Sequence, residues 1–527
     1  MNRPAKGYDT REYQLQTVRQ IWGSFFIQNH QAVLVVAPTG AGKTVISSFF
    51  ILKVLELLKQ PVLFMAGRRE IIHQSATKLY QGGLWPGIIM AGETPAPMRE
   101  LQVASIQTYL SWRRRGKLGI HKPDVVVVDE AHGIGAKELA KLIEEMMQNG
   151  TKVLGLTATP IGTNGVGLGK YFTKMICTPG FKWMAAHEPP YLVLPEYYSG
   201  IQPDLNGVKI VGKDKEFDER AVNAVIDTKM LVGNVVDMYF KHSAFEPTIL
   251  FANSVPHSMH LEEMFRNANS ELRVQHIDGE TDHDVRDNAN RELGLGMLHM
   301  ILNYGTHVEG TDIPAVSCII DAAPTTSLRR YLQRGGRGSR VSTGKTRFNY
   351  HCHSGNVQRH GRLELEREWI LCEGRENIEM NDRIMGKQKK ERVCPSCGYL
   401  YTGSNCTHCG EPYKRLPEEM PFLEAELVHM TNDDFHEAVQ LRRKKLNEDQ
   451  KVSIEKEFVA EAMAWCAEHG KKRGMVAHVF EQKFKKPMPR EGWNLPMRNP
   501  SPETESYMKS YLIRFAKGRA AARSRRA

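Results

Sequence analysis

The sequence lacks the segments that would carry it to or across a membrane. Residues 1–20 are polar, and no apolar stretch typical of a signal peptide follows Met1. The apolar run over residues 45–58 is interrupted by Lys53 and Glu56, so it is too polar for a membrane span. We therefore expect a cytoplasmic protein.

The sequence also lacks a disulfide framework. It holds nine cysteines, and the five outside two Cys-x-x-Cys pairs are scattered, which favours a reducing compartment. Thiolates at the spacing of the two pairs can surround one tetrahedral Zn²⁺, and such a module is too small to fold on a core of its own. We predict a zinc ribbon over residues 391–413, with the ligands Cys394, Cys397, Cys406 and Cys409.

Acidic residues are absent from one part of the chain. Residues 509–527 hold seven basic side chains and no acidic one, and the net charge of the whole chain is +11. This balance favours a polyanionic partner, although a solvated basic tail is the alternative. The length of 527 residues, 41% of them hydrophobic and 25% charged, is that of a globular protein with about three or four domains.

The most informative stretch is Ala-Pro-Thr-Gly-Ala-Gly-Lys-Thr, residues 37–44. It lies between the apolar runs 32–36 and 45–52, which predicts a buried strand, a turn and a helix. Backbone N–H groups at such a turn cradle a polyphosphate, while Lys43 adds a positive charge and the Thr44 hydroxyl can bind Mg²⁺. Ala37 occupies a position that is usually glycine. The stretch predicts a phosphate-binding loop.

Polar side chains end the other apolar runs of the first half of the chain. Val125–Val128 leads into Asp129-Glu130-Ala131-His132, where one carboxylate can hold Mg²⁺ and the next can deprotonate water. The runs 61–67 and 103–108 read as further strands, and 153–156 leads into Thr157 and Thr159. Strands that alternate with helical stretches predict a doubly wound parallel α/β domain.

A second α/β domain follows without a phosphate loop of its own. Its predicted strands are residues 248–252, 274–279, 300–304 and 317–321, and a helix starting near Ser327 carries Gln333, Arg337 and Arg340. Arginines from a second domain can reach the γ-phosphate and stabilise the transition state of hydrolysis. This organisation predicts a two-domain motor that opens and closes on a nucleotide.

At this point the order of motifs resembles the core of a superfamily 2 helicase of the DEAD/DEAH-box type. The motifs are Tyr-Gln at 13–14, the phosphate loop, GRRE at 67–70, DEAH at 129–132, TAT at 157–159, EGTD at 309–312 and QRGGRGSR at 333–340. The resemblance covers about residues 8–365. Gly67 stands where proline is frequent, and Gly305-Thr306-His307 replaces a more apolar stretch. A zinc ribbon after this core looks like the bacterial and phage RadD-type DNA repair helicases.

The resemblance implies roles for individual residues. The nucleotide site would consist of Tyr13, Gln14, Pro38, Thr39, Gly40, Ala41, Gly42, Lys43, Thr44, Gly310 and Asp312, with Gln14 on adenine. The catalytic set would be Lys43, Asp129, Glu130, His132, Gln333, Arg337 and Arg340, with Mg²⁺ on Thr44 and Asp129. Thr157 and Thr159 would couple hydrolysis to domain motion, and Arg68, Thr108 and Ser254 are candidates for contact with the nucleic-acid backbone.

The expected fold is α/β, with two tandem RecA-like doubly wound parallel-sheet domains, a small zinc ribbon and an α-helical C-terminal domain. The predicted boundaries are 1–200 for the first RecA-like domain, 201–228 for a connector, 229–365 for the second RecA-like domain, 366–390 for a linker, 391–413 for the ribbon, 414–508 for the helical domain and 509–527 for the basic tail. The helical part carries a surface of lysines and aromatic residues around Phe480 and Trp493, whose aromatics suit a core and whose lysines suit DNA.

The sequence thus predicts an ATP- and Mg²⁺-dependent DNA helicase or translocase, acting in repair, recombination or replication. We expect single-stranded, forked or duplex DNA as its partner, with single-strand-binding or other repair proteins as further partners, in a monomer located near the nucleoid of a bacterial or phage-infected cell. The alternatives are an RNA helicase and an ATP-gated nucleic-acid-binding switch that does not unwind. The histidines at 351, 353 and 360 suggest a second metal site or an HNH-like nuclease, but they suit a turn after a strand better, and no paired acids accompany them.

Overall fold

The computed structural model describes the chain from residue 10 to residue 511 with gaps. The gaps are residues 68, 97, 118–121, 163–164, 213–214, 306–311, 389–390, 413–447, 485, 490–494, 502–503, 506 and 509–510. The chain forms two compact units, Met1–Arg415 and Leu416–Ala527. Over the described ranges, each helix is too short or too polar to cross a membrane.

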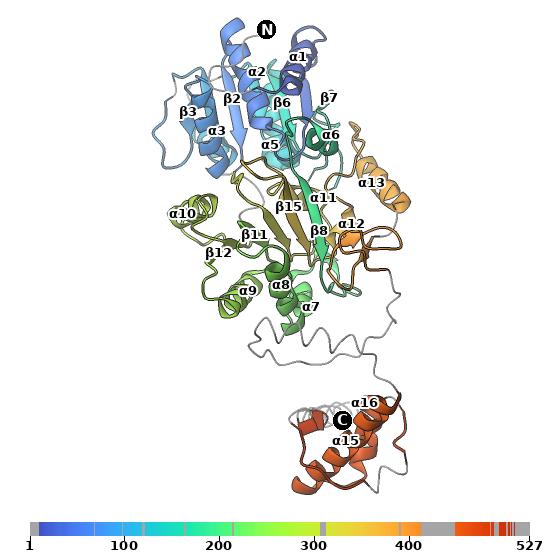
Figure 1. Ribbon diagram of the computed structural model, residues 1–527. Helices are drawn as coiled ribbons and strands as arrows, with labels where there is room; N and C mark the ends of the chain where they lie inside the picture. Colours follow the sequence, from blue (N-terminus) through green and yellow to red (C-terminus); the bar gives the residue numbers. More distant parts are fainter. Residues whose placement is uncertain are drawn as a thin grey trace, which may run out of the picture. The chain divides into compact units, whose positions relative to one another are not determined.

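The first sheet has seven parallel strands in the order β3-β4-β2-β5-β6-β1-β7 (Figure 1). In chain order the elements are α1 (Glu12–Phe26), β1 (Ala32–Val36), α2 (Lys43–Leu57), β2 (Val62–Ala66), α3 (Arg69–Gln81), β3 (Gly87–Ile89), β4 (Leu101–Ser105), α4 (Ile106–Arg114), β5 (Val125–Val128), α5 (Lys137–Gln148), β6 (Lys152–Thr157), β7 (Lys174–Cys177) and α6 (Phe181–Ala186). Every residue of β1, β2, β4 and β5 is buried, because helices cover both faces of a doubly wound sheet.

The second sheet has six parallel strands in the order β12-β13-β11-β14-β15-β8. Its elements are β8 (Leu194–Ser199), α7 (Glu219–Ile226), α8 (Lys229–His242), β11 (Thr248–Phe251), α9 (Val255–Ala268), β12 (Val274–Ile277), α10 (His283–Gly294), β13 (Met300–Asn303), β14 (Cys318–Asp321), α11 (Leu328–Gly335), β15 (Arg347–Cys352) and α12 (Asn356–His360). Both sheets are open and parallel, which confirms the predicted α/β class with two RecA-like domains.

The second domain begins earlier than predicted. Residues 194–199, which the prediction placed in the first domain, form the edge strand β8 of the second sheet and pair with β15 from Leu194↔Arg347 onward. The run resembles any half-buried strand, and its partner lies about 150 residues downstream, beyond the reach of local pattern. Between β8 and α7, the predicted connector contains a two-stranded hairpin of β9 (Ile210–Val211) and β10 (Glu216–Phe217).

The predicted linker after the second domain is ordered and returns to the first domain. We call residues 366–374 the return segment. The Gly167 and Gly169 N–H groups donate to the carbonyl oxygens of Gly374 (2.6 Å) and Cys372 (2.7 Å). A Cβ at Gly167 would lie 2.1 Å from the Cys372 oxygen, so this approach requires glycine. Trp369 packs against the cores of both domains, and α13 (Glu376–Lys387) follows.

The cysteine-rich module packs on the second domain. It contains the short strands β16 (Arg392–Val393) and β17 (Leu400–Tyr401). The Ser199 N–H at the end of β8 donates to the Gly398 carbonyl (2.7 Å), and Tyr198 meets Tyr399 edge-on. Leu400 is fully buried in the core of the second domain. The module is therefore docked on this domain through β8.

The unit Leu416–Ala527 has a small core of its own. Its described helices are α15 (Glu448–Glu468) and α16 (Met475–Phe484), and Phe458, Trp465 and Phe480 are buried between them. The predicted role of Phe480 as a core residue agrees with this burial. Lys483 lies 4.2 Å from the centre of the Phe458 ring. Trp493 and almost all of the predicted basic tail lie outside the described residues.

Candidate active site

The predicted phosphate loop connects β1 to α2 and closes tightly. Gly40 and Gly42 adopt φ values of +88° and +80°, which L-residues with a side chain rarely adopt. Gly42 directly precedes α2, whose first N–H groups face the loop. A Cβ at Gly42 would lie 2.5 Å from Gln14 Nε2. The loop thus has the geometry of an anion cradle at a helix N-terminus.

Tyr13 and Gln14 of α1 lie against this loop. The Tyr13 hydroxyl donates to the Ala41 carbonyl (2.5 Å), and Gln14 Nε2 donates to the same oxygen (3.2 Å). The Arg11 N–H donates to Gln14 Oε1 (3.0 Å), so the Gln14 amide is held on both sides. The Arg11 guanidinium lies 4.6 Å from the centre of the Tyr191 ring. Neither Arg11 nor Tyr191 was predicted, because Arg11 precedes the Tyr13-Gln14 motif and no motif marks residues 180–193.

The acidic pair follows β5 directly. Asp129 is 9% exposed, and its Oδ1 accepts a hydrogen bond from the Glu130 N–H (3.0 Å). Glu130 adopts a φ of +50°, a conformation that costs a residue other than glycine about 1–3 kcal/mol and is typical of functional sites. Its Oε1 lies 3.8 Å from Lys43 Nζ. The Thr44 hydroxyl and the Asp129 carboxylate are hard oxygen donors, which fit Mg²⁺.

Side chains of the second domain meet this acidic pair across the cleft. Gln333 Nε2 on α11 donates to Glu130 Oε2 (3.4 Å), and Arg329 Nη1 on the same helix lies 2.6 Å from His132 Nε2. His132 Nδ1 in turn lies 3.2 Å from Glu130 Oε2. Four side chains from two domains therefore form one connected network around Glu130. Arg329 was not predicted, because it precedes the recognised motif.

The electrostatic surroundings keep Glu130 ionised. Burial favours the protonated carboxyl, but the Lys43 charge, a hydrogen bond with His132 and the Arg337 charge outweigh it and lower the pKa of Glu130 to about 2. Arg337 itself is 6% exposed. The carboxylate is therefore charged at neutral pH, as a group that accepts a proton from water must be.

Asp312 holds two cations, one from each domain. Arg340 Nη1 lies 3.0 Å from Asp312 Oδ1, and Lys78 Nζ of α3 lies 2.9 Å from Oδ2. Burial favours the protonated carboxyl, yet the charges of Arg340 and Lys78 lower the pKa of Asp312 to about 2. Asp312 was predicted to bind the nucleotide, whereas here both of its oxygens contact cations. The neighbouring Gly310, also predicted for the nucleotide site, lies outside the described residues.

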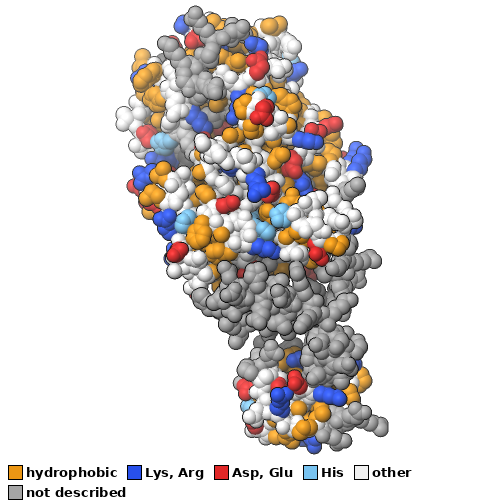
Figure 2. Space-filling view, in the orientation of Figure 1, with side chains coloured by type: hydrophobic (Ala, Val, Ile, Leu, Met, Phe, Trp, Pro, Cys, Tyr) orange, Lys and Arg blue, Asp and Glu red, His pale blue; other side chains and the backbone are white. Residues whose placement is uncertain are grey.

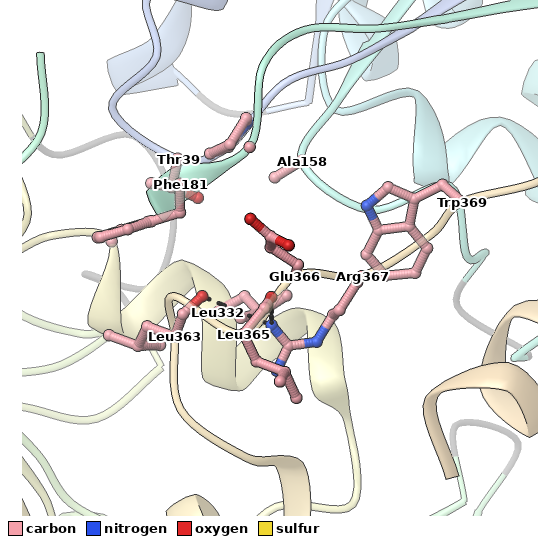
Figure 3. Close-up of a pocket in the computed structure, with 12 residues that line it drawn as sticks. Thr39, Ala158, Phe181, Leu332, Leu363, Leu365, Glu366, Arg367 and Trp369 are labelled. Atoms are coloured by element: carbon pink, nitrogen blue, oxygen red, sulfur yellow. Dashed lines mark hydrogen bonds between the residues drawn. The ribbon is translucent and has the colours of Figure 1, made fainter. Parts of the chain in front are cut away.

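The two domains approach each other closely at the phosphate loop. A Cβ at Gly336, which follows α11, would lie 2.3 Å from Thr39 Cβ, and a Cβ at Gly40 would lie 3.4 Å from Ser339 Oγ. A pocket between the domains is lined from one side by Pro38, Thr39, Ala158, Gly180 and Phe181 and from the other by Leu332, Gly336, Leu363, Leu365, Glu366, Arg367 and Trp369. Figure 3 shows the Glu366 carboxylate pointing into it between Thr39 and Ala158.

The predicted coupling residues lie at the end of β6, beside β1. Thr157 and Thr159 are buried, and the Thr157 hydroxyl donates to the Thr159 carbonyl (2.8 Å) while accepting from the Thr159 N–H (3.2 Å). This closed turn carries Ala158 into the pocket between the domains. This arrangement places a rigid turn at a position that a change in the distance between the two domains would affect.

The three residues predicted to contact nucleic acid lie in different structural settings. Ser254 is buried and caps α9 by accepting from the His257 N–H (3.2 Å). Thr108 lies in the first turn of α4, since β4 ends at Ser105 rather than at residue 108 as predicted. Arg68 lies outside the described residues. Side chains of both charge signs are scattered over the face seen in Figure 2.

The four predicted zinc ligands converge. Among the described residues, the sulfur atoms of Cys394, Cys397, Cys406 and Cys409 form a group within 4.8 Å of one another. Cys394 Sγ lies 3.5 Å from Cys409 Sγ, and Cys397 Sγ lies 3.7 Å from Cys406 Sγ. Tetrahedral Zn²⁺ with Zn–S bonds of about 2.3 Å requires sulfurs about 3.8 Å apart, so the cluster fits this ion.

The histidines that suggested a nuclease lie in the interior of the second domain. His351 is part of β15, and its Nε2 lies 2.9 Å from Ser243 Oγ. His360 Nε2 lies 2.9 Å from the Thr325 carbonyl oxygen. All three histidines are buried, and in the described ranges the one group of metal-binding side chains found is the cysteine cluster. The strand and turn that the sequence favoured agree with this placement.

Comparisons with known proteins match the two halves of the site. Residues 7–162 match the family described as "Type III restriction enzyme, res subunit", and residues 230–342 match "Helicase conserved C-terminal domain". A 51.5 kDa protein of a Lactococcus phage is 26% identical over 416 residues, which is 75% of this chain and 83% of that protein. The Saccharomyces cerevisiae protein assigned as ATP-dependent helicase IRC3 is 25% identical over 65% of this chain and 50% of its own length.

A solved structure shows the same fold. A fragment of the HsdR subunit of a type I restriction enzyme from Vibrio vulnificus aligns with a TM-score of 0.53 at 18% identity, over 68% of this chain and 66% of that fragment. The first matched family covers the phosphate loop and the acidic pair, and the second covers Gln333, Arg337 and Arg340. The two matched families fall on the two RecA-like domains in chain order, so the chain is similar to superfamily 2 helicases over both domains.

Proposed function

We propose that the chain is a DNA-stimulated ATPase that translocates on, unwinds or remodels DNA during repair, recombination or replication. The observation that carries this proposal is the network in which Gln333 and Arg329 of the second domain contact Glu130 and His132 of the first. Such a network makes the catalytic carboxylate dependent on domain closure. A motor requires this dependence, because hydrolysis must follow a change in domain spacing.

The chain's own groups divide the reaction between the domains. ATP supplies the phosphoryl group, and Mg²⁺ on Thr44 and Asp129 would neutralise its charge. Lys43 lies near Glu130 and lowers its pKa. A triphosphate in the loop would draw Lys43 to itself and bring negative charge close to Glu130. Both changes raise the pKa of this carboxylate, so Glu130 becomes a better proton acceptor once the substrate is present.

The second domain would supply the opposing positive charge. Gln333 orients Glu130 through its amide, and Arg337 and Arg340 lie on the loop after α11 that approaches Gly40. Guanidinium groups stabilise the charge that develops on a transferring phosphoryl group. The Arg11–Tyr191 pair beside Gln14 offers a flat surface that suits a nucleotide base.

DNA is the proposed partner because the first domain matches a family named for a restriction enzyme. The net charge of +11 and the docked cysteine module are compatible with a nucleic-acid surface. An RNA helicase with the same core is the second candidate, since the core recognises a backbone that both nucleic acids share.

The deciding experiment measures ATP turnover with single-stranded DNA, duplex DNA, forked DNA and RNA, beside a strand-displacement assay. We expect DNA to raise kcat more than RNA does. A larger increase with RNA would replace DNA by RNA as the substrate. Turnover that no nucleic acid changes would contradict the proposal, and stimulated turnover without displacement would identify a translocase. Glu130→Gln serves as the inactive control.

A further inference from the structure

The carboxylate of Asp312 lies between two cations that belong to different domains. Lys78 approaches from α3 of the first domain, at 2.9 Å from Oδ2, and Arg340 approaches within the second domain, at 3.0 Å from Oδ1. The side chains of Lys78 and Asp312 are each about one third exposed, and that of Arg340 is 17% exposed. Each oxygen thus contacts one cation, and the Lys78 contact exists only while the domains are close.

The division of the two oxygens has a consequence for Arg340. Each oxygen of a carboxylate can accept more than one donor, so one carboxylate can hold two cations. Here Lys78 contacts Oδ2, and Arg340 contacts Oδ1 through Nη1. The Lys78 contact therefore helps to fix the carboxylate that holds an arginine beside the phosphate loop.

The helix that carries Lys78 links this carboxylate to a second part of the first domain. α3 begins at Arg69, directly after the end of β2, and Lys78 lies in its last turn. Ile72 and Leu79 anchor the helix in the core of the first domain, and Arg69 lies 3.9 Å from Glu93. Because this helix is short and anchored in the core, it moves together with the first domain. The distance between Lys78 and Asp312 therefore depends on the position of the first domain relative to the second.

We propose that Lys78 is a positioning residue, which orients Arg340 in the closed state by holding the Asp312 carboxylate in place. The proposal rests on the proposed ATPase function and adds a residue to it. Lys78 touches neither the phosphate loop nor Glu130, and it acts through Asp312 alone. Domain closure brings Lys78 to Asp312, which fixes the carboxylate that holds Arg340 at the moment when a phosphoryl group requires this arginine.

The test compares steady-state turnover in five variants of the full chain. We expect Lys78→Ala to lower kcat about fivefold, within the usual range of coupling between sites, while KM for ATP changes less than about twofold. Lys78→Arg keeps the charge and should restore most of kcat. The double variant Asp312→Asn with Lys78→Ala should be no slower than Asp312→Asn alone, because both substitutions break the same Lys78–Asp312 ion pair. Lys53→Ala removes a similar ion pair within α2 and should leave kcat unchanged.

An unchanged kcat in Lys78→Ala, or losses that add in the double variant, would overturn the inference. A rise in KM with constant kcat would also contradict it, because it would assign Lys78 to binding. Melting temperatures of all variants show whether any loss is structural, and rescue by Lys78→Arg excludes a simple packing defect. If no nucleic acid raises the turnover of the natural chain, the proposed function fails, while the comparison of kcat values still decides the role of Lys78.

Discussion

The two RecA-like sheets have the same architecture but face the nucleotide site with opposite ends. In the first sheet, the phosphate loop, Asp129 and Thr157 all lie at the carboxyl ends of strands. In the second sheet, the loop with Arg337 and Arg340 lies at the start of two strands: the Val193 N–H donates to the Ser339 carbonyl (2.8 Å), and a Cβ at Gly338 would lie 2.3 Å from Phe348 near the start of β15.

The carboxyl ends of the second sheet are used differently. Ser199, the last residue of β8, pairs with Gly398 of the cysteine module. One sheet thus places the predicted phosphate loop at its strand ends, while the other places there a small cysteine module that a metal would stabilise. The comparison teaches that fold alone does not place chemistry, since the same parallel sheet contributes different edges. Four predictions follow from the difference between the domains, and they are ordered by the size of the expected effect.

The largest effect on ATP turnover should come from substitutions at the carboxyl ends of the strands of the first domain. Lys43→Ala or Glu130→Gln should lower ATP turnover at least about a hundredfold, because each removes a charge that acts on the reacting phosphoryl group or water. Binding of nucleic acid should persist, and fluorescence anisotropy with labelled DNA measures it. Turnover of Glu130→Gln close to that of the natural chain would exclude Glu130 as the proton acceptor.

The strand ends of the second sheet should respond to loss of a cysteine ligand. Cys406→Ser should abolish stoichiometric zinc binding, measured by elemental analysis, and lower the melting temperature of the second domain, since zinc supplies on the order of 10 kcal/mol to modules of this kind. Cys177→Ser alters an exposed cysteine of the first domain and provides the control. Retention of one zinc per chain in Cys406→Ser would refute the assignment of the ligands.

The approach of the two domains can be blocked sterically. Gly336→Ala adds a methyl group 2.3 Å from Thr39 Cβ without straining the backbone, because Gly336 has a φ of −62°. We expect kcat to fall about tenfold, because a misplacement of about one ångström lowers the rate of other enzymes by at least this factor. Gly23→Ala in α1 has nothing within 4 Å and should leave kcat unchanged. Equal activity of the two variants would show that closure is looser than described.

The smallest expected effect is a pH dependence of stability that arises in the second domain. Burial lowers the pKa of His353 to about 4, so the second domain prefers this imidazole neutral. The unfolded chain binds the proton at a higher pH, near 6.5, and stability is therefore full above that pH and decreases as the pH falls towards 4. At pH 5.5 the loss from this group is about 1 kcal/mol. Thermal unfolding at pH 7.5 and 5.5 should show a smaller pH dependence in His353→Gln.

The sequence predicts those structural features that a short run of neighbouring residues determines. The phosphate loop, the acidic pair and the cysteine spacing are short and chemically specific, so residue types alone were enough to predict Lys43, Glu130 and Cys394 as site residues. The four-valine strand before Asp129 was visible because every residue of β5 is buried. These features depend on neighbours in the chain, which a sequence displays directly.

Contacts between distant segments were not accessible in this way. The pairing of β8 with β15, the Arg329–His132 contact and the Lys78–Asp312 pair join residues 153 to 234 positions apart. Neither Arg329 nor Lys78 differs in local context from a lysine or arginine on a solvated helix face. Their roles arise from the spacing of the domains, which no local pattern contains.

The return segment gives the motor a mechanical constraint. The chain crosses from the first domain to the second before β8 and crosses back at residues 366–374, where Gly167 and Gly169 hold it. A body joined to another at one point can swivel freely, whereas a body joined at two points turns only about the line between them. Opening of the cleft between the two domains would therefore be restricted to rotation about the line that joins these two crossings.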